Sequence, residues 1–446
     1  MMKQRIVYVC TRCGASTRQW RGQCPDCGAW NSFEEGVENA GAARPRVPPV
    51  RPIAVSSVDL APDTRLETKS PELDRVLGGG LVAGAVVLVG GEPGIGKSTL
   101  LLQVLGRLAG EVTGVLYVTG EESIRQVALR SQRLGVAVDS VRLLAETRVE
   151  SILDVLESES PRIVVIDSIQ TMYTEALQSA PGSVAQVRES AARLVRHAKD
   201  HAVSVLLVGH VTKDGAIAGP RVLEHMVDTV LYFESEADRR FRVIRAVKNR
   251  FGAANELGLF AMTERGLREV RNPSAIFLAR GAEDVAGSVV TVVREGSRPL
   301  LVEIQALVDE ASGPPRRLTV GIDQGRLNML LAVLHRHAGV STQGLDVYAN
   351  VVGGVRIAET SADLAVLAAV RSTLGTRPVD RGLLVFGEVG LAGEIRPVPG
   401  GEERLREGAK HGFSKALVPV ANIPRNTPCG IEVLGVERVD RALDFI

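Results

Sequence analysis

The stretch best suited to chemistry is GEPGIGKST, residues 91–99. An apolar run precedes it and a helical pattern follows, which is the setting in which a glycine-rich loop surrounds phosphates with its N–H groups. In that setting Lys97 reaches the β- and γ-phosphate oxygens and Ser98 ligates Mg²⁺, whereas a plain glycine turn would need neither. The sequence therefore predicts a site for ATP and Mg²⁺, formed by nine consecutive residues: Gly91, Glu92, Pro93, Gly94, Ile95, Gly96, Lys97, Ser98 and Thr99.

Two further apolar runs end in carboxylates of the kind that an ATPase needs. RIVVIDS supplies Asp167, a second candidate ligand for Mg²⁺. Hydrolysis needs a group that orients or deprotonates water; YVTGEES carries Glu121 and Glu122, and we favour Glu121 as the base. These carboxylates could also be solvated side chains at strand ends. His210, which closes another apolar run, is a candidate sensor of the γ-phosphate or a structural histidine.

Two CxxC pairs, ten residues apart, lie near the N-terminus. Four thiolates at about 2.3 Å give the closed tetrahedral shell of structural Zn²⁺, with iron as the minor alternative, and such a shell leaves no open position for catalysis. Four residues between the knuckles could contact nucleic acid or, equally, another protein: Arg12, Arg18, Trp20 and Arg21. The predicted zinc ligands are Cys10, Cys13, Cys24 and Cys27.

Composition excludes several classes of protein. Lys plus Arg number 53 and Asp plus Glu 52, so the net charge of +1 indicates that any contact with nucleic acid comes from local patches. No apolar run reaches the roughly 18 residues that span a bilayer, and the start of the sequence lacks the pattern of a signal peptide. Clustered cysteines and the lone Cys429 fit a reducing compartment. We therefore expect a cytosolic protein.

At 446 residues the chain should divide into two or three domains. Short β-branched runs alternate with helical patterns, which predicts an α/β fold with a parallel sheet and crossover helices. The strands expected in its nucleotide-binding part are 85–91, 114–120, 162–168, 203–210, 227–234 and 241–249. A second α/β region has strands at 287–295 and 300–309, a helix at 361–375 and a glycine-rich hairpin at 382–401. We expect a cysteine ribbon at 1–35, a linker at 36–59, an ATPase domain at 60–272 and a further domain at 273–446.

Lys248, Asn249 and Arg250 end the strand expected at 241–249 and precede a glycine-rich exit. Alone, they are a strand end with two cations on the surface. Together with the cysteine pairs and the phosphate loop, however, the pentapeptide KNRFG resembles the bacterial RadA (Sms) family, and the resemblance runs nearly from end to end. It implies a Cys₄ zinc knuckle, a RecA-like P-loop ATPase core and a C-terminal Lon-protease-like α/β domain.

The resemblance also implies roles for individual residues. In RecA-like ATPases the site lies between protomers, so Lys248 and Arg250 are expected to act on the nucleotide bound by a neighbouring subunit. The alternative is a DNA-facing or structural strand end. Lys213 and Arg221 are expected to neutralise DNA phosphates, although solvated surface loops explain them equally well. The two candidate DNA-binding loops are 172–184 and 212–225.

The C-terminal region resembles the Lon proteolytic domain, in which a Ser nucleophile acts with a Lys base. Ser361 falls on the nucleophile position and Arg404 on the base position. A guanidinium with a pKa above about 12 cannot accept the proton, and Asp363 replaces a glycine of the protease pattern. We therefore expect a proteolytically inactive domain that supports ring assembly or binds DNA, for which the basic stretch 313–321 is a weak candidate.

These features together predict a ring-forming, zinc-containing, DNA-dependent ATPase that acts on single-stranded DNA, and the resemblance implies a role in homologous recombination and DNA repair. By resemblance, it translocates on single-stranded DNA and promotes branch migration of recombination intermediates. Its expected partners are single-stranded and branched DNA, the RecA recombinase and further copies of the chain in a hexameric ring. Two other functions stay open: an ATP-dependent Ser protease of the Lon type, and a DNA-binding module that ATP switches without translocation.

Overall fold

The computed structural model contains two compact units, Met1–Ser235 with Arg240–Glu269 and Glu236–Arg239 with Val270–Ile446. The predicted domain limits stay a prediction, but the predicted α/β fold class is confirmed. Within the part of the chain that the structure describes, no helix has both the length and the apolar character needed to cross a bilayer. The described residues are 4–39, 65–110, 114–136, 141–210, 220–235, 241–270, 272, 274, 278, 285–354, 356–425 and 430–446.

A small three-stranded antiparallel sheet carries the cysteines. Its strands β1 (Gln4–Cys10), β2 (Ser16–Thr17) and β3 (Phe33–Asn39) lie in the order β2-β1-β3. Strand β3 pairs with β1 along its whole length, so it continues into the first residues of the predicted linker. The rest of that linker lies outside the described residues.

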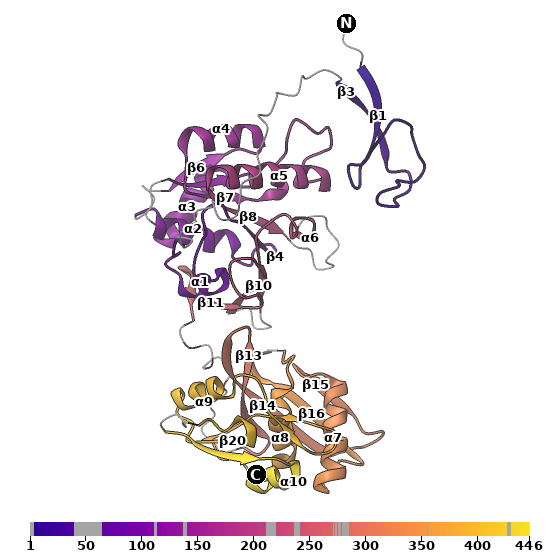
Figure 1. The fold of residues 1–446 in the computed structure, drawn as a ribbon, viewed down its shortest axis with the longest axis vertical. Coiled ribbons are helices and arrows are strands. Elements are labelled where there is room, and N and C mark those ends of the chain that lie inside the picture. The colour runs from indigo at the N-terminus through magenta and orange to yellow at the C-terminus, as the bar shows by residue number, and fades with distance from the viewer. Residues whose placement is uncertain are drawn as a thin grey trace, which may run out of the picture. The chain divides into compact units, whose positions relative to one another are not determined.

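A nine-stranded sheet forms the centre of the first unit, in the order β12-β11-β10-β9-β4-β8-β7-β5-β6. Figure 1 labels β4, β7, β8 and β10 of this sheet among the helices of the unit. Its six strands from β9 to β6 are parallel. The run 241–249, which we expected to continue this parallel sheet, is antiparallel to β9 instead. The strands are β4 (Val86–Gly91), β5 (Val115–Thr119), β6 (Arg142–Ala145), β7 (Ile163–Asp167), β8 (Ser204–His210), β9 (Thr229–Ser235), β10 (Phe241–Asn249), β11 (Leu257–Thr263) and β12 (Gly266–Glu269).

Helices cover both faces of this sheet because their apolar residues recur at helical spacing. Helix α5 (Val184–His201) buries Val187, Ala191, Leu194 and Ala198 in the same core as helix α4 (Val149–Glu159). The opposite core contains α1 (Pro71–Leu77), α2 (Lys97–Leu108) and Val127 of α3 (Ile124–Leu134). Two short elements complete the unit, η3 (Ile169–Thr171) and α6 (Pro220–Leu223).

The second unit is built on a seven-stranded mixed sheet in the order β15-β16-β14-β13-β17-β20-β21. The strands are β13 (Ser288–Glu295), β14 (Arg298–Glu310), β15 (Arg317–Val320), β16 (Leu345–Val351), β17 (Leu383–Val385), β20 (Lys415–Pro419) and β21 (Glu432–Val436). Its helices are α7 (Gln324–Ala338), α8 (Asp363–Gly375), α9 (Gly401–Lys410) and α10 (Val439–Ala442). Four single turns are η5 (Val352–Gly354), η6 (Thr360–Ala362), η7 (Val420–Asn422) and η8 (Leu443–Phe445).

The glycine-rich stretch predicted as one hairpin at 382–401 divides between two sheets. Strand β17 joins the large sheet, parallel to β13 and β20. Only β18 (Glu388–Val389) and β19 (Ile395–Arg396) form an antiparallel pair. The glycines end the short strands, so the hairpin is much shorter than the sequence pattern suggested.

Candidate nucleotide site and metal centre

Four neighbouring parallel strands bring the predicted ATPase residues to one edge of the sheet. The carboxyl ends of parallel strands meet at the same edge, and here β4 ends at Gly91, β8 at His210, β7 at Asp167 and β5 at Thr119. The register places Gly91 opposite His210 and Thr119 opposite Asp167. The phosphate loop and the two predicted acidic groups therefore lie together.

Lys97 is almost wholly buried at this edge. Its Nζ donates to the carbonyl oxygens of Gly91 at 2.8 Å and Glu92 at 2.9 Å, and it lies 3.2 Å from Nδ1 of His210. Burial lowers the pKa of Lys97 to about 8, although Asp167 and Glu121 both act to raise it. An ammonium group held in low dielectric is stabilised by a nearby anion, which is what a phosphate would supply.

His210 connects Lys97 to Glu121. Because the ammonium of Lys97 can only donate, Nδ1 of His210 accepts, and Nε2 then carries the proton and donates to Oε1 of Glu121 at 3.1 Å. The hydrogen bond from His210 lowers the pKa of Glu121 to about 2, and a second one from Ser168 acts in the same direction. A carboxylate so weakly basic is better suited to orienting water than to taking its proton.

Glu122 points to a different partner. Its carboxylate forms an ion pair with Arg130 of helix α3, and its backbone N–H donates to Oγ1 of Thr119. The choice of Glu121 over Glu122 from the sequence therefore agrees with the geometry, because Glu121 alone of the two contacts His210.

Tyr117 is a member of this site that the sequence analysis missed. Its hydroxyl donates to Oδ2 of Asp167 and also interacts with the side chain of Ser98, so it contacts both predicted ligands of Mg²⁺. The ring is fully buried, and burial beside Asp167 raises the pKa of Tyr117 well above its usual value. The hydroxyl thus stays a donor. One signal was present in the sequence, since a phenol in an otherwise apolar buried strand needs a polar partner.

The loop itself is shaped by glycines and by one arginine. Gly94 and Gly96 have φ angles of 75° and 116°, in the region that favours glycine. Arg242 of β10 donates from Nε to the carbonyl oxygen of Ile95 at 3.0 Å, a contact that no local pattern predicts. The residues fit ATP and Mg²⁺, because the glycine loop precedes a helix N-terminus and Ser98 and Asp167 offer oxygen ligands. Bound Mg²⁺ would neutralise charge on the β- and γ-phosphates.

Lys248 and Arg250 lie at the opposite edge of the same sheet. The register pairs Asn249 with Thr229 and Thr229 with Val87, next to the start of β4. Four residue steps of about 3.3 Å along β4, from Val87 to Gly91, then separate this level of the sheet from the loop by about 13 Å. The structure therefore does not bring these two residues to the phosphate loop of their own chain.

Both cations are fixed at that edge by residues 224–228. Nζ of Lys248 donates to the carbonyl oxygens of Glu224 at 2.7 Å and Val227 at 2.8 Å, and its burial lowers its pKa. Arg250 contacts the buried carboxylate of Asp228 at 3.2 Å, yet 56% of its side chain stays exposed. Arg250 is thus held in place and still open to another molecule.

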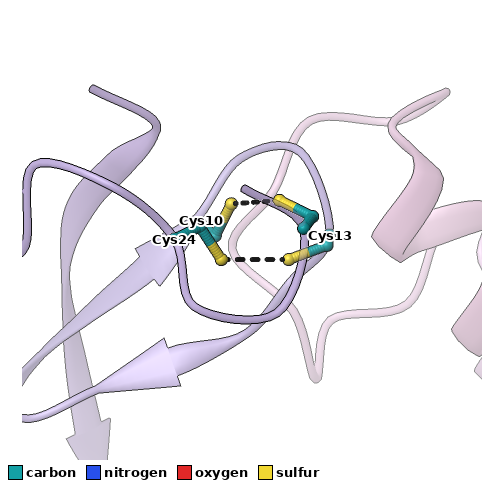
Figure 2. A group of neighbouring side chains, drawn as sticks. Cys10, Cys13 and Cys24 are labelled. Atoms are coloured by element: carbon teal, nitrogen blue, oxygen red, sulfur yellow. Dashed lines mark hydrogen bonds between the residues drawn. The ribbon is translucent and has the colours of Figure 1, made fainter. Parts of the chain in front are cut away.

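The four predicted zinc ligands form one cluster (Figure 2). All four sulfur atoms lie within 4.8 Å of one another, with Cys10 and Cys27 at 3.7 Å and Cys13 and Cys24 at 3.5 Å. Tetrahedral bonds of about 2.3 Å require sulfur atoms about 3.8 Å apart, so the cluster fits Zn²⁺. Each knuckle closes with a backbone hydrogen bond, from Gly14 N–H to Cys10 and from Gly28 N–H to Cys24.

In the second unit, Ser361 and Arg404 are neighbours, as the resemblance to Lon implied. Nη1 of Arg404 donates to Oγ of Ser361 at 3.2 Å, and Ser361 donates to Oε1 of Glu359 at 2.6 Å. Arg404 also donates to both carboxylate oxygens of Glu359 and to the carbonyls of Val292 and Pro399. Ser361 is 2% exposed and Arg404 is 0% exposed. The centre is closed and its polar groups are paired.

The remaining candidates have mixed outcomes. Asp363 forms an ion pair with Arg326 of helix α7, so this departure from the protease pattern has a structural partner. The candidate DNA-binding loop at 172–184 is held by Gln186, whose side chain hydrogen-bonds the backbone at Thr174, Leu177 and Ser179. Lys213, the side chain of Arg221 and Cys429 lie outside the described residues.

Comparison with known proteins gives the family. An AAA domain matches residues 50–216 and a rubredoxin metal binding domain matches residues 8–35. The DNA repair protein RadA of Pseudomonas aeruginosa is 59% identical, over 100% of both chains. The RadA of Escherichia coli is 54% identical, over 98% of this chain and 97% of its own, and that of Bacillus subtilis is 48% identical, over 99% of each.

The chain belongs to the RadA family of DNA repair proteins. Its AAA domain implies ATP, with Mg²⁺ as the accompanying ion. Its metal binding domain, with four cysteines in one cluster, supports zinc.

Proposed function

We propose that the chain is a DNA-dependent ATPase of homologous recombination that moves along single-stranded DNA and promotes branch migration together with the RecA recombinase. The observation that carries this proposal is the end-to-end similarity to proteins named DNA repair protein RadA, in a chain whose AAA domain gathers Lys97, Asp167 and Glu121 at one sheet edge. Branched and single-stranded DNA are its proposed substrates.

Within one chain, the residues at that edge divide the work. Lys97 and the loop N–H groups hold the phosphates, and Ser98 and Asp167 hold Mg²⁺, positioned by Tyr117. Glu121 orients the attacking water from its fixed contacts with His210 and Ser168. His210 contacts Lys97 through one ring nitrogen and Glu121 through the other. Binding of a phosphate at Lys97 can therefore change the position of Glu121.

A second copy of the chain is proposed to complete the site. Lys248 and Arg250 lie at the far edge of the sheet from their own loop, so within a ring, proposed to be hexameric, they can serve the nucleotide of an adjacent subunit. The exposure of Arg250 supports this role. An arginine supplied in this way contributes on the order of 10³–10⁵ to the rate of hydrolysis.

The experiment that tests the proposal is ATP hydrolysis with and without single-stranded DNA, paired with branch migration on a three-strand intermediate. Wild type should be stimulated by DNA and should move the branch, and Lys97→Ala should do neither. If single strands neither bind nor stimulate, the recombination role fails while the ATPase role survives.

Two other functions predict different results. A DNA-binding module switched by ATP would bind single strands in a nucleotide-dependent manner and leave the branch where it is. A Lon-type protease is disfavoured by the closed centre around Ser361, in which a guanidinium stands where a base is needed.

A further inference from the structure

We propose that the loops of the zinc ribbon are a stacking surface for single-stranded DNA, centred on Trp20 and Trp30. This inference rests on the proposed function, because it locates one place where the strand is held. It concerns the residues between and just beyond the two cysteine pairs, for which zinc binding alone gives no role.

Two large aromatic rings are exposed on this small unit. Trp20 is 54% exposed and Trp30 is 71% exposed. A monomeric protein rarely leaves indole rings so open unless they contact another molecule. They are also the only two tryptophans of the chain, so its entire indole content lies on the ribbon.

The two rings converge on one glycine. A Cβ atom at Gly22 would lie 3.8 Å from the ring of Trp30 and 4.0 Å from that of Trp20. The backbone holds them there, because Gln23 pairs with Trp30 in an antiparallel bridge and Asn31 donates to the carbonyl oxygen of Gly22 at 2.7 Å. The rings therefore flank one short, firmly bonded stretch of backbone, where neighbouring bases can stack.

Three arginines lie in the same short segment as the rings. Arg12, Arg18 and Arg21 are exposed, and none of the ion pairs found among the described residues includes them. Guanidinium groups bind phosphate and also stack on bases. In the stretch 10–30 these three arginines face one acidic residue, Asp26. Glu34 and Glu35 follow in β3, so the arginines offer local contacts for phosphates rather than a strongly basic surface.

The metal core limits how much the charge can contribute. Four thiolates around one Zn²⁺ leave two negative charges beneath the surface, so they offset most of the attraction from the arginines. Stacking should then supply most of the affinity, and the dependence on salt should be shallow. Each base stacked on an aromatic ring contributes enough for a roughly five- to hundredfold change in affinity.

The two tryptophans make the test direct, since indole fluorescence of the full zinc-loaded chain reports only on the ribbon. We expect oligothymidylate to quench this fluorescence over the same concentration range in which it raises the anisotropy of a labelled strand. Trp20→Ala and Trp30→Ala should each weaken binding roughly five- to hundredfold, with Phe at either position recovering part of the loss. Gln19→Ala, an exposed neighbour, is the matched control, and bound zinc is measured in every variant to show that the ribbon is folded.

Each outcome is informative. If the labelled strand binds but neither the fluorescence nor the affinity of the Trp variants changes, the ribbon does not hold DNA, a protein partner becomes its ligand, and the proposed function stands. If the strand fails to bind at all, the proposed function fails together with this inference.

Discussion

The two units of this chain each place a buried cation beside a carboxylate and a hydroxyl group, with opposite consequences. At the ATPase edge, Lys97 is held by two loop carbonyls and His210, beside a glycine loop that can admit a ligand. At the Ser361 centre, Arg404 is 0% exposed and donates to five acceptor atoms of its own unit. One centre can admit a ligand, and the other has its polar groups paired within its own unit.

The difference follows from the chemistry of the two cations. A Lys can lose its proton when it is buried, as the lowered pKa of Lys97 illustrates, but a guanidinium cannot. Arg404 instead pairs with Glu359, a partly buried carboxylate that would be costly without a partner. A buried cation beside a carboxylate and a hydroxyl group thus supports chemistry where a ligand can enter, and it adds to stability where none can.

The largest effect is expected from removing Arg250, the cation proposed to reach the ATPase site of a neighbouring subunit. Arg250→Ala should lower ATP hydrolysis by about 10³–10⁵-fold while nucleotide binding persists, because the phosphate loop is untouched. Arg245→Ala is the matched control, since Arg245 lies in the middle of the same strand and pairs with Glu234. An Arg250→Ala protein that assembles normally and hydrolyses ATP at the wild-type rate would remove the shared site.

A second prediction tests whether the Ser361 centre is structural. Arg404→Met should lower the free energy of unfolding by about 3 kcal/mol, because the partly buried Glu359 and two backbone carbonyls lose their donor. Ser361→Ala, the control, should cost only about 1 kcal/mol, and neither variant should change ATP hydrolysis at a temperature where it is folded. Chemical denaturation at constant pH measures both.

The free energy of unfolding should change with pH in opposite directions in wild type and in Arg404→Met. Burial raises the pKa of Glu359, but Arg404 and Ser361 outweigh it and the pKa lies below the usual value. In wild type this contribution is complete above about pH 4.3 and is lost as the pH falls. In Arg404→Met, burial, the largest influence on that pKa, should raise it against the smaller effects of Ser361 and the Arg294 N–H, so stability should instead fall as the pH rises above about 4.3. Equal pH profiles would contradict the assignment.

The smallest predicted effect concerns Tyr117. Tyr117→Phe keeps the ring but removes the hydrogen bond to Asp167, a bond to a charged group that is typically worth about 1.5–3 kcal/mol. We expect the concentration of Mg²⁺ that half-saturates hydrolysis to rise roughly 10-fold or more. Binding of a fluorescent nucleotide without Mg²⁺ should not change. A loss of binding in both conditions would indicate a folding defect instead.

Local sequence predicted the parts of both centres that depend on neighbouring residues. The phosphate loop and the CxxC pairs are each contained in a short segment, and the strands ending at Gly91 and Asp167 follow from their apolar runs. Contacts across the fold could not be predicted in this way. Tyr117 meets Asp167 from the next strand, and Arg242 reaches Ile95 from a strand that runs antiparallel to its neighbour.

The same reversal of direction explains the placement of Arg250. A parallel strand would have carried it toward the phosphate loop, whereas antiparallel β10 carries it to the far edge. The family resemblance suggested a role in trans, but only the strand order supplies the geometric reason. Likewise, the sequence placed Ser361 and Arg404 at the nucleophile and base positions of the Lon pattern. It could not show that Glu359 would hydrogen-bond both of them.

The central claim is that two copies of the chain build one ATPase site, and mixed assembly tests it most directly. Lys97→Ala and Arg250→Ala proteins, each inactive alone, are assembled together in equal amounts. Roughly a quarter of the interfaces then pair an intact phosphate loop with an intact Arg250 if the protomers mix at random. The account predicts that hydrolysis recovers to about that fraction of wild type, and a mixture as inactive as its two components would contradict it.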